Sequence, residues 1–385
     1  MKRRVGLIGT CLLLGLAGLL VLGGVPAQAK NVPIPKMMTW TSYDVGSSGY
    51  MLVGHVGATL FDKYKIKVRL IPAGTDIPRV YPIRLKDAEV AFHGLGSYFM
   101  QEGEWDYSTP EWGPQAIRAL YFAQHPGLCL GVRGDSPIKT YKDLKGKKIA
   151  KFPTHVLTLI SEVHLVYAGL TWKDVQGVMT PGYAAAIKMV MDNKIDATHI
   201  NPTASLAYEM QSMPYGVRYI ALPFKNKENW ARLIKHAPAY GPFKTTIGAG
   251  LSNEKPLETV SYSYPIGISY DFLPNDKAYA ITKLLVEAYP DYAKRDKALK
   301  AFWTPQGNME LFEKMPIPMH PGSILYLKEA GFWKPNHDKL QAERLVRQAK
   351  LKALWTKTMD EALAKKMKMK DFPKLWLQKK KEAGL

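Results

Sequence analysis

Several short polar segments of this chain could hold an anionic group. They are Ser47-Ser48-Gly49, Gly74-Thr75, Thr154-His155 and Thr203, and each precedes a stretch with helical spacing. The first turn of a helix has free backbone N–H groups and the positive end of the helix dipole, so it can bind a carboxylate together with a nearby hydroxyl. Taken singly, each segment is also typical of an ordinary helix cap or turn. Their recurrence favours binding of a small organic anion.

Two histidines and two tyrosines stand in or beside these segments. His93 follows an apolar run and His155 follows Thr154, so metal binding has to be weighed. The sequence has no HxH or HExxH spacing and few carboxylates near the two histidines, so we expect no metal and no other cofactor. His155 can instead donate a hydrogen bond to a ligand or to a nearby carbonyl. Tyr50 and Tyr183 begin helices, where their rings can line a pocket or join the core.

Motifs of catalysis are missing from the sequence. It has no GxSxG elbow and no P-loop, and Gly94-Leu95-Gly96 lacks the third glycine of a dinucleotide fingerprint. Asp44 and Asp76 stand alone, and we interpret them as turn caps. The sequence therefore favours a binding protein over an enzyme.

The elements that position these segments alternate between apolar strands and amphipathic helices, which predicts parallel α/β layers. The first part of the chain contains expected strands at 37–43, 66–71 and 88–92 and expected helices at 50–64 and 77–85. The second part starts near Cys129, with expected strands at 148–152, 175–180 and 195–200 and expected helices at 156–168, 183–193 and 204–211. Each candidate segment then lies beyond the carboxyl end of a strand, where such sheets bind ligands.

The pattern changes after about residue 245. Residues 259–268 read as a strand that could return to the first lobe, 276–289 as a helix, and most of the remainder, including 340–370, as helical. We predict a signal peptide at 1–29, the first part of lobe 1 at 30–125, lobe 2 at 126–244, a return to lobe 1 at 245–300, and a helical region at 301–385 that packs on the lobes. This organisation has two crossings between the lobes and a hinge.

The N-terminus predicts export. Lys2, Arg3 and Arg4 precede an apolar stretch, and Ala27-Gln28-Ala29 matches the small-x-small pattern of a signal-peptidase site. An uncleaved membrane anchor is the alternative, although the apolar stretch is short for a spanning helix. Cleavage after Ala29 leaves Cys129 as the one remaining cysteine, which excludes an intramolecular disulfide and a cysteine-based zinc site. We expect a periplasmic protein.

The net charge of +20 attracts anions and anionic surfaces. The basic residues gather toward the C-terminus, where they form either a solvated helix face or a field that gathers an anionic solute. We see no nucleic-acid recognition module and expect no nucleic-acid partner.

The sequence resembles the TAXI subfamily of TRAP-transporter solute-binding proteins over most of the chain after residue 29. The residues that carry the resemblance are, in order, Gly46-Ser47-Ser48-Gly49-Tyr50, Ala73-Gly74-Thr75, the segment 87–91, the segment 144–150, the segment 192–197 and Ile317-Pro318-Met319-His320-Pro321-Gly322. The last segment is the most specific match, and the set in this order is stronger than any one motif.

The resemblance implies a periplasmic type II binding fold that closes around a small carboxylate such as glutamate or 2-oxoglutarate and delivers it to a TRAP-type membrane permease. Carried over by position, the solute contacts are Ser47, Ser48, Gly49, Tyr50, Gly74, Thr75 and His93 in lobe 1, and Thr154, His155, Tyr183 and Thr203 in lobe 2. Departures from the family pattern at Tyr50, at His93 and in the segment 153–156 leave the solute open.

We therefore expect a monomeric two-lobed α/β protein with a helical C-terminal extension that captures a small organic anion for transport. The alternative from the sequence is a ligand-binding sensor subunit that reports to a membrane kinase, and a secreted enzyme on the same scaffold is a third possibility.

Overall fold

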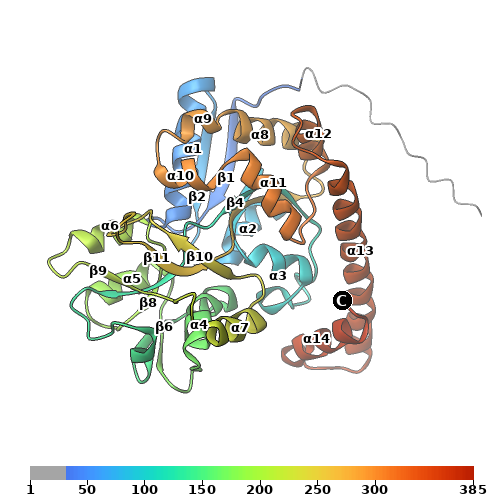
Figure 1. Ribbon diagram of the computed structural model, residues 1–385. Helices are drawn as coiled ribbons and strands as arrows, with labels where there is room; N and C mark the ends of the chain where they lie inside the picture. Colours follow the sequence, from blue (N-terminus) through green and yellow to red (C-terminus); the bar gives the residue numbers. More distant parts are fainter. Residues whose placement is uncertain (1–31) are drawn as a thin grey trace, which may run out of the picture. The chain divides into compact units, whose positions relative to one another are not determined.

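The structure of the protein is a computed structural model that describes residues 32–385, so the predicted signal peptide lies outside the described residues. Figure 1 shows the arrangement of its helices and strands. The strands are β1 (Met37–Ser42), β2 (Lys67–Pro72), β3 (Val90–His93), β4 (Ile117–Gln124), β5 (Cys129–Arg133), β6 (Lys148–Lys151), β7 (Gln176–Met179), β8 (Thr198–Ile200), β9 (Val217–Ile220), β10 (Gly241–Thr245), β11 (Leu257–Ser261) and β12 (Ser263–Tyr270).

The helices cover the sheets and build the C-terminal part of the chain. They are α1 (Ser48–Tyr64), α2 (Asp76–Arg84), α3 (Gly96–Glu102), α4 (His155–Ala168), α5 (Tyr183–Met191), α6 (Ser205–Ser212), α7 (Lys227–His236), α8 (Asn275–Glu287), α9 (Tyr289–Tyr292), α10 (Lys297–Phe302), α11 (Pro305–Lys314), α12 (Pro321–Glu329), α13 (Pro335–Ala364) and α14 (Phe372–Glu382), with short 3₁₀ turns η2 (Trp105–Tyr107), η3 (Tyr141–Leu144) and η4 (Met369–Asp371).

Lobe 1 is built on a sheet with the strand order β2-β1-β3-β12-β4. β1 pairs in parallel with β2 and with β3, whereas β12 runs antiparallel to both β3 and β4. The antiparallel strand β12 comes from a distant part of the sequence, so the sheet is complete only when the chain returns from lobe 2.

Lobe 2 repeats the same plan. β5 runs antiparallel between β8 and β9, and β6 pairs in parallel with β7. A parallel bridge from Ile149 to Ala197 joins the two groups into the order β7-β6-β8-β5-β9. Here the antiparallel strand is β5, the first strand after the chain leaves lobe 1. The antiparallel strand of each lobe's sheet therefore adjoins a segment where the chain crosses between the lobes. The predicted two-lobed type II α/β fold is confirmed.

Two crossing segments lie side by side between the lobes. The segment after β4 pairs with the segment around β11, because Leu128 N–H donates to the carbonyl of Val260 at 2.9 Å and His125 N–H donates to that of Tyr262 at 3.0 Å. The hydroxyl of Thr259 also donates to the carbonyl of Leu128. β11 pairs with β10 outside both sheets. Two paired strands thus form the hinge.

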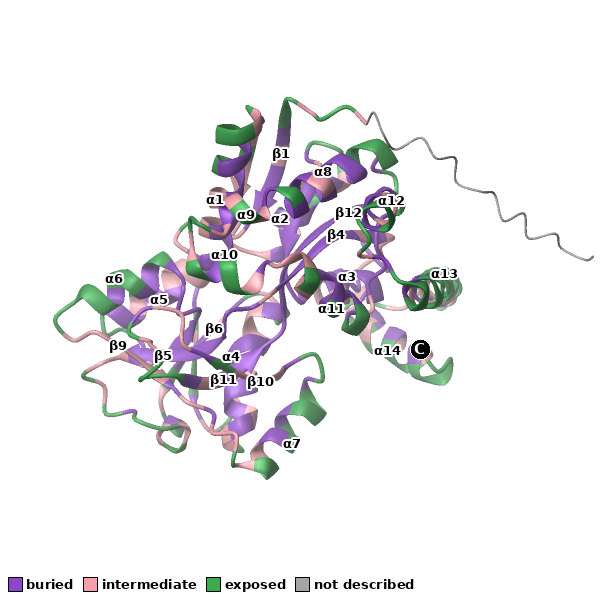
Figure 2. Cartoon of the chain, turned by 45° about the horizontal axis from the view of Figure 1, so that its top comes forward, coloured by how far each residue is buried: buried purple, intermediate pink, exposed green. Residues whose placement is uncertain are grey.

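Burial explains why these residues form strands. Figure 2 shows the inner strands of both sheets as buried, whereas the helices expose one face. The edge strands β2 and β7 have only exposed and half-buried residues. All four residues of β3 and all eight of β12 are buried, as expected for strands covered on both sides. The strand that we predicted at 259–268 is divided at Tyr262 into β11 and β12, because the chain there changes partners from β10 to β4.

The C-terminal helices pack on lobe 1. The side chains of α13 reach lobe 1 through Gln341, whose amide bonds both backbone groups of Met319, and through Gln348, which donates to Gln101 and to the carbonyl of Ile117. None of the helices within residues 32–385 combines the length and the apolar character needed to cross a membrane.

Candidate functional site

Some of the predicted loops of the two lobes converge on one small cavity. Its volume is about 50 Å³, and a single water needs roughly 10–15 Å³ on this measure, so the space corresponds to a few heavy atoms. The lining residues are Tyr43, Asp44, Ser47, Gly74, Arg79, His125, Leu128, Leu157, Ile160, Tyr183, His199, Asn201, Tyr262 and Tyr264. They come from lobe 1, from lobe 2 and from both crossing segments.

Arg79 brings a buried positive charge to the cavity wall. Its Nε donates to the carbonyl of Ser42 at 3.3 Å, Nη1 to Asp76 Oδ1 at 2.9 Å and Nη2 to the carbonyl of Ala73 at 2.9 Å. The guanidinium carbon lies 3.9 Å from the centre of the Tyr43 ring. A guanidinium has five N–H groups, so these three bonds hold the side chain in place and leave two donors for a ligand.

His93 lies behind this arginine and does not line the cavity. It is fully buried, with Nδ1 3.0 Å from Ser97 Oγ and Nε2 3.3 Å from Asp76 Oδ1. Burial alone would raise the pKa of Asp76, but the neighbouring His93 and Arg79 lower it to about 2. Asp76 is therefore a carboxylate at neutral pH, and His93 positions it against Arg79.

Direct contacts between the lobes close the cavity. Ser48 Oγ of lobe 1 and Thr203 Oγ1 of lobe 2 are 2.9 Å apart, and both side chains are buried. The carbonyl of Gly46 accepts hydrogen bonds from Ser205 Oγ at 3.0 Å and from Leu206 N at 3.3 Å. The structure thus shows the lobes closed on each other at the N-terminal ends of α1 and α6.

The first loop needs its small residues. Ser47 caps α1 by accepting a hydrogen bond from Tyr50 N at 3.2 Å. A Cβ on Gly49 would lie 2.2 Å from the ring of Tyr43 and 2.5 Å from the hydroxyl of Tyr264. No real Cβ contact is that short, so glycine at this position lets both aromatic rings reach the cavity.

Neutral polar rings form much of the rest of the wall, together with the apolar side chains of Leu128, Leu157 and Ile160. Tyr183 Oη accepts a hydrogen bond from Asn201 N at 3.0 Å. Burial lowers the pKa of both His125 and His199 to about 3, with a further contribution to His125 from His199, so both imidazoles are uncharged at neutral pH. The cavity therefore offers hydrogen-bonding groups around the single cation of Arg79.

The structure separates the predicted site residues into three groups. Ser47, Gly74 and Tyr183 line the cavity, and Ser48, Gly49 and Thr203 support it by the contacts above. Tyr50, Thr75, His93 and Thr154 are not among the lining residues. The Oγ1 of Thr154 is buried and has no hydrogen-bond partner among residues 32–385.

His155 lies elsewhere, against a second and larger pocket. Its Nδ1 is 3.1 Å from Asp106 Oδ1 of lobe 1, and the side chain is largely exposed. This contact between α4 and η2 is a further bridge between the lobes. The hydrogen bond to Asp106 raises the pKa of His155, which favours its charged form.

Several lining residues were not among the predicted site residues. They are Tyr43, Asp44, Arg79, His125, His199, Asn201, Tyr262 and Tyr264. Asn201 lies two residues before the predicted Thr203, and Asp44 lies in the first loop. Their positions at strand ends could therefore have identified both as candidate site residues. Arg79 lies inside α2, and nothing local distinguishes it from a surface arginine.

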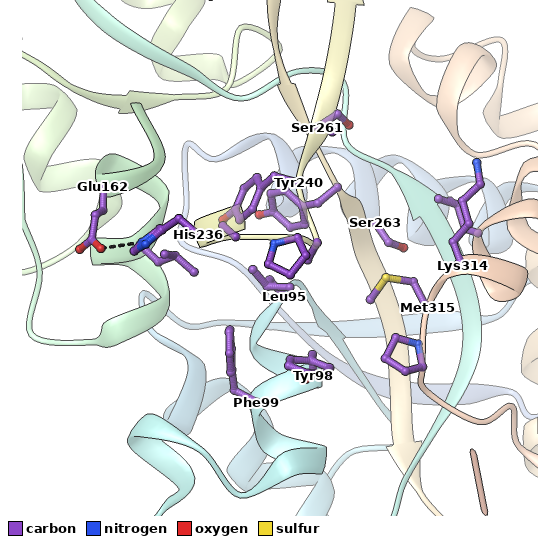
Figure 3. A pocket seen from close by; sticks show the side chains of 18 of the residues that line it. Leu95, Tyr98, Phe99, Glu162, His236, Tyr240, Ser261, Ser263, Lys314 and Met315 are labelled. Atoms are coloured by element: carbon purple, nitrogen blue, oxygen red, sulfur yellow. Dashed lines mark ion pairs between the residues drawn. The ribbon is translucent and has the colours of Figure 1, made fainter. Parts of the chain in front are cut away.

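The larger pocket has a volume of about 1080 Å³ and lies between α3, α4, β10 and the end of α11. Figure 3 shows apolar side chains such as Leu95, Phe99 and Met315 around it. In its wall, His236 Nε2 and Glu162 Oε1 lie 2.8 Å apart. No fully buried cation lies in the described wall of this pocket, so the small cavity with Arg79 is the better site for an anionic group.

Within the described part of the chain, no three His, Cys, Asp or Glu side chains come together in a way that could hold a metal ion. The chemistry that the small cavity supports is hydrogen bonding and charge pairing to a bound molecule.

Solved structures of similar architecture include a periplasmic transporter, with 14% identity over 79% of this chain and 95% of that chain and a TM-score of 0.49. The periplasmic aliphatic sulphonate binding protein SsuA from Escherichia coli has 16% identity over 86% of this chain and 93% of its own, with a TM-score of 0.43. SsuA from Xanthomonas axonopodis pv. citri, bound to MOPS, has 14% identity over 87% and 95%, with a TM-score of 0.43.

No curated protein matches the sequence. A family model described as the NMT1-like family matches residues 86–331, which is more than half of the chain. The matched segment runs from β3 through the whole of lobe 2 and back into lobe 1. The chain therefore belongs to the NMT1-like family.

Proposed function

We propose that this protein captures a small organic anion between its two lobes and passes it unchanged to a membrane transporter. The observation that carries the proposal is the small cavity at the meeting point of the two lobes, with the buried guanidinium of Arg79 in its wall. A buried charge is costly to maintain unless it is paired or used, and Asp76 occupies only part of the guanidinium.

The wall also indicates the class of solute. Arg79 offers two further N–H donors to an anionic oxygen, as a carboxylate requires. Asp44 adds a half-buried acceptor, and its carboxylate faces Gly74 of lobe 1 and Gly182 of lobe 2. The proposed solute is therefore a carboxylate that also presents a hydroxyl or ammonium group to Asp44, and the volume of the closed cavity favours a small one.

Closure of the lobes would provide the capture step. A solute that contacts both lobes binds the closed form more tightly than the open form, and so shifts the population toward closure. The cross-lobe bond of Ser48 with Thr203 and the contact of His155 with Asp106 exist only when the lobes meet. Opening at the paired crossing segments would release the solute.

The partner and the compartment form the finer part of the proposal. The signal-peptide pattern at residues 1–29 supports a periplasmic location. The resemblance to the TAXI subfamily, above all at residues 317–322, supports a TRAP-type permease as the receiver of the solute.

A thermal-shift screen tests the proposal. Glycine, glutamate, glycolate and lactate are compared with acetate, pyruvate and 2-oxoglutarate, which lack a hydroxyl or ammonium group, and with the uncharged acetamide and the cation ethylamine. A ligand of the folded state raises the melting temperature by mass action. We expect at least one of the acids to raise it while acetamide and ethylamine do not. A response to ethylamine alone, or to none of the acids, would contradict capture of an organic anion. Recovery of the bound acid unchanged by mass spectrometry separates binding from turnover.

A further inference from the structure

The wall of the small cavity contains a contact between two polar side chains that lacks a hydrogen-bond acceptor. His125 follows β4 in the first crossing segment, and Asn201 follows β8 in lobe 2. His125 Nε2 and Asn201 Nδ2 are 3.3 Å apart, and both residues are buried. Two nitrogens at this distance form a hydrogen bond only if one of them is an acceptor.

The histidine has its proton on Nε2. Gly127 N–H donates to His125 Nδ1 at 3.1 Å, so Nδ1 carries the lone pair. Burial lowers the pKa of His125 to about 3, and a neutral imidazole has one proton for its two nitrogens. Nε2–H is therefore a donor that points at Asn201.

The asparagine presents its NH₂ group to the histidine. Its Oδ1 accepts a hydrogen bond from Thr203 N at 3.0 Å and another from Thr203 Oγ1 at 2.8 Å. Rotating the amide by half a turn would bring its NH₂ group against the backbone N–H of Thr203, which can only donate. Asn201 Nδ2 is consequently a second donor, and the contact with His125 joins two donors.

We infer that His125 Nε2 and Asn201 Nδ2 form an oxygen-binding subsite, in which both groups donate to one carboxylate or keto oxygen of the bound acid. This inference rests on the proposed function and names the side of the cavity that holds that oxygen. Tyr43 Oη is a further donor in the same wall, and it is buried without a hydrogen-bond partner among residues 32–385.

The subsite is linked to lobe closure. Thr203 Oγ1 donates its hydrogen to Asn201 Oδ1, so in its 2.9 Å contact with Ser48 Oγ it is the acceptor. A chain of hydrogen bonds thus runs from Ser48 in lobe 1 through Thr203 to the amide of Asn201. Closure supplies the first member of this chain and so supports the orientation of the amide that faces the solute.

The position of the proton can be measured without any ligand. The full chain labelled with ¹⁵N-histidine gives separate nitrogen signals for the two tautomers, and the spectrum of His125→Gln identifies the signals of His125. We expect a protonated Nε2 and an unprotonated Nδ1 at pH 7. A proton on Nδ1 would make Nε2 the acceptor for Asn201 and would overturn the inference.

A single isosteric substitution tests the donor contact. In Asn201→Asp, a carboxylate oxygen replaces the NH₂ group, accepts from His125 Nε2–H and keeps both bonds from Thr203. The matched control is Asn308→Asp. Asn308 is equally buried and accepts from Phe122 N–H, but its Nδ2 meets only the sulfur of Met309 among the described residues. We expect Asn201→Asp to melt no lower than the parent and Asn308→Asp to melt clearly lower. Equal losses would overturn the inference.

Binding of acetate, pyruvate and glutamate to the same variants completes the test. The acid that shifts the melting temperature of the parent should bind Asn201→Asp about tenfold more weakly or worse, because a repelling oxygen replaces a donor. Unchanged affinity in this variant would overturn the subsite while the proposed function stands. If no acid of the screen binds the parent, the proposed function fails. In that case the proton position of His125 and the stability of Asn201→Asp still show whether two donors meet between these residues.

Discussion

Arg79 is held by protein groups before any solute reaches it. One carboxylate, two backbone carbonyls and the face of Tyr43 surround its guanidinium. A side chain fixed in this way loses little freedom when it binds, which favours affinity. It also means that a substitution of Arg79 acts on folding and on binding at once, so that the two effects have to be separated by design.

Substituting the buried partner Asp76 as well separates the effect on folding from the effect on binding. Arg79→Gln leaves Asp76 without its cation, and the loss of one member of a buried pair costs about 3–5 kcal/mol of unfolding free energy. The double variant Arg79→Gln/Asp76→Asn removes both charges and should recover most of that stability. Neither variant should bind the acid found in the screen. Chemical unfolding measures the first effect and calorimetry the second. Binding by the double variant would show that Arg79 is structural.

The helix α1 offers a matched pair of glycines at the scale of an element. A Cβ on Gly49 would overlap the ring of Tyr43, whereas a Cβ on Gly54 meets nothing within 4 Å. Gly54→Ala should stabilise the protein by about 0.5–1 kcal/mol through helix propensity. Gly49→Ala should destabilise it by roughly 1–3 kcal/mol through overpacking and should also weaken solute binding, because it displaces a cavity wall. Urea unfolding of both variants checks the signs, and a stabilised Gly49→Ala would contradict the packing.

The C-terminal helices are fastened at one buried acid. Arg347 of α13 donates to both oxygens of Glu102, at 2.9 and 2.8 Å, and Lys380 of α14 bonds Glu102 and Glu104. Glu102 itself has no exposed side-chain surface. Two helices far along the sequence are thus tied to the end of α3.

Loss of the Glu102 carboxylate should weaken the packing of α13 and α14 on lobe 1. Glu102→Gln leaves Arg347 without a full negative partner and leaves Lys380 with Glu104 alone, and we expect a loss of about 3 kcal/mol together with faster proteolysis in α14. The control is Asp291→Asn, which breaks the surface ion pairs with Lys63 and Lys294 and should cost less than about 1 kcal/mol. Equal losses in the two variants would show that the Glu102 cluster does not fasten these helices.

At the scale of the whole molecule, buried histidines should make the fold sensitive to acid. Burial lowers the pKa of His125, His164 and His199 to about 3, 4 and 3. Between pH 6.5 and 4 the unfolded chain binds protons at these residues and the folded protein does not. Stability therefore falls as pH falls, by up to about 1.4 kcal/mol per pH unit for each histidine.

The carboxylate of Asp76 acts in a lower range. With its pKa lowered to about 2, it adds stability above about pH 4 that is lost as pH falls toward 2. Unfolding by guanidinium at pH 7.5, 6 and 5 isolates the histidines. His164→Asn, which can still donate to the carbonyl of Ile160, should reduce the dependence of the unfolding free energy on pH by the contribution of one histidine. Equal stability at pH 7.5 and pH 5 would show that the histidines are accessible to protons in the folded protein.

Local sequence patterns were sufficient for the elements and for part of the site. Apolar periodicity and turn residues located α1, α4, α5 and the strands beside them, because these signals act within a few residues of chain. The small residues Ser47 and Gly49 marked the first loop for the same reason. The strand at 259–268 was found but not its division at Tyr262, because the change of partner from β10 to β4 depends on distant segments.

By itself, the sequence determined the α/β class, the alternation of strand, polar loop and helix, and the cap of α1 at Ser47. Only the tertiary structure decided which polar groups share one cavity. It placed His93 behind Arg79 and His155 against another pocket, and it brought His125 from a crossing segment against Asn201 of lobe 2. The physical reason is that capping and periodicity are local, whereas the partner of a buried polar group is set by chains that meet from far apart in the sequence.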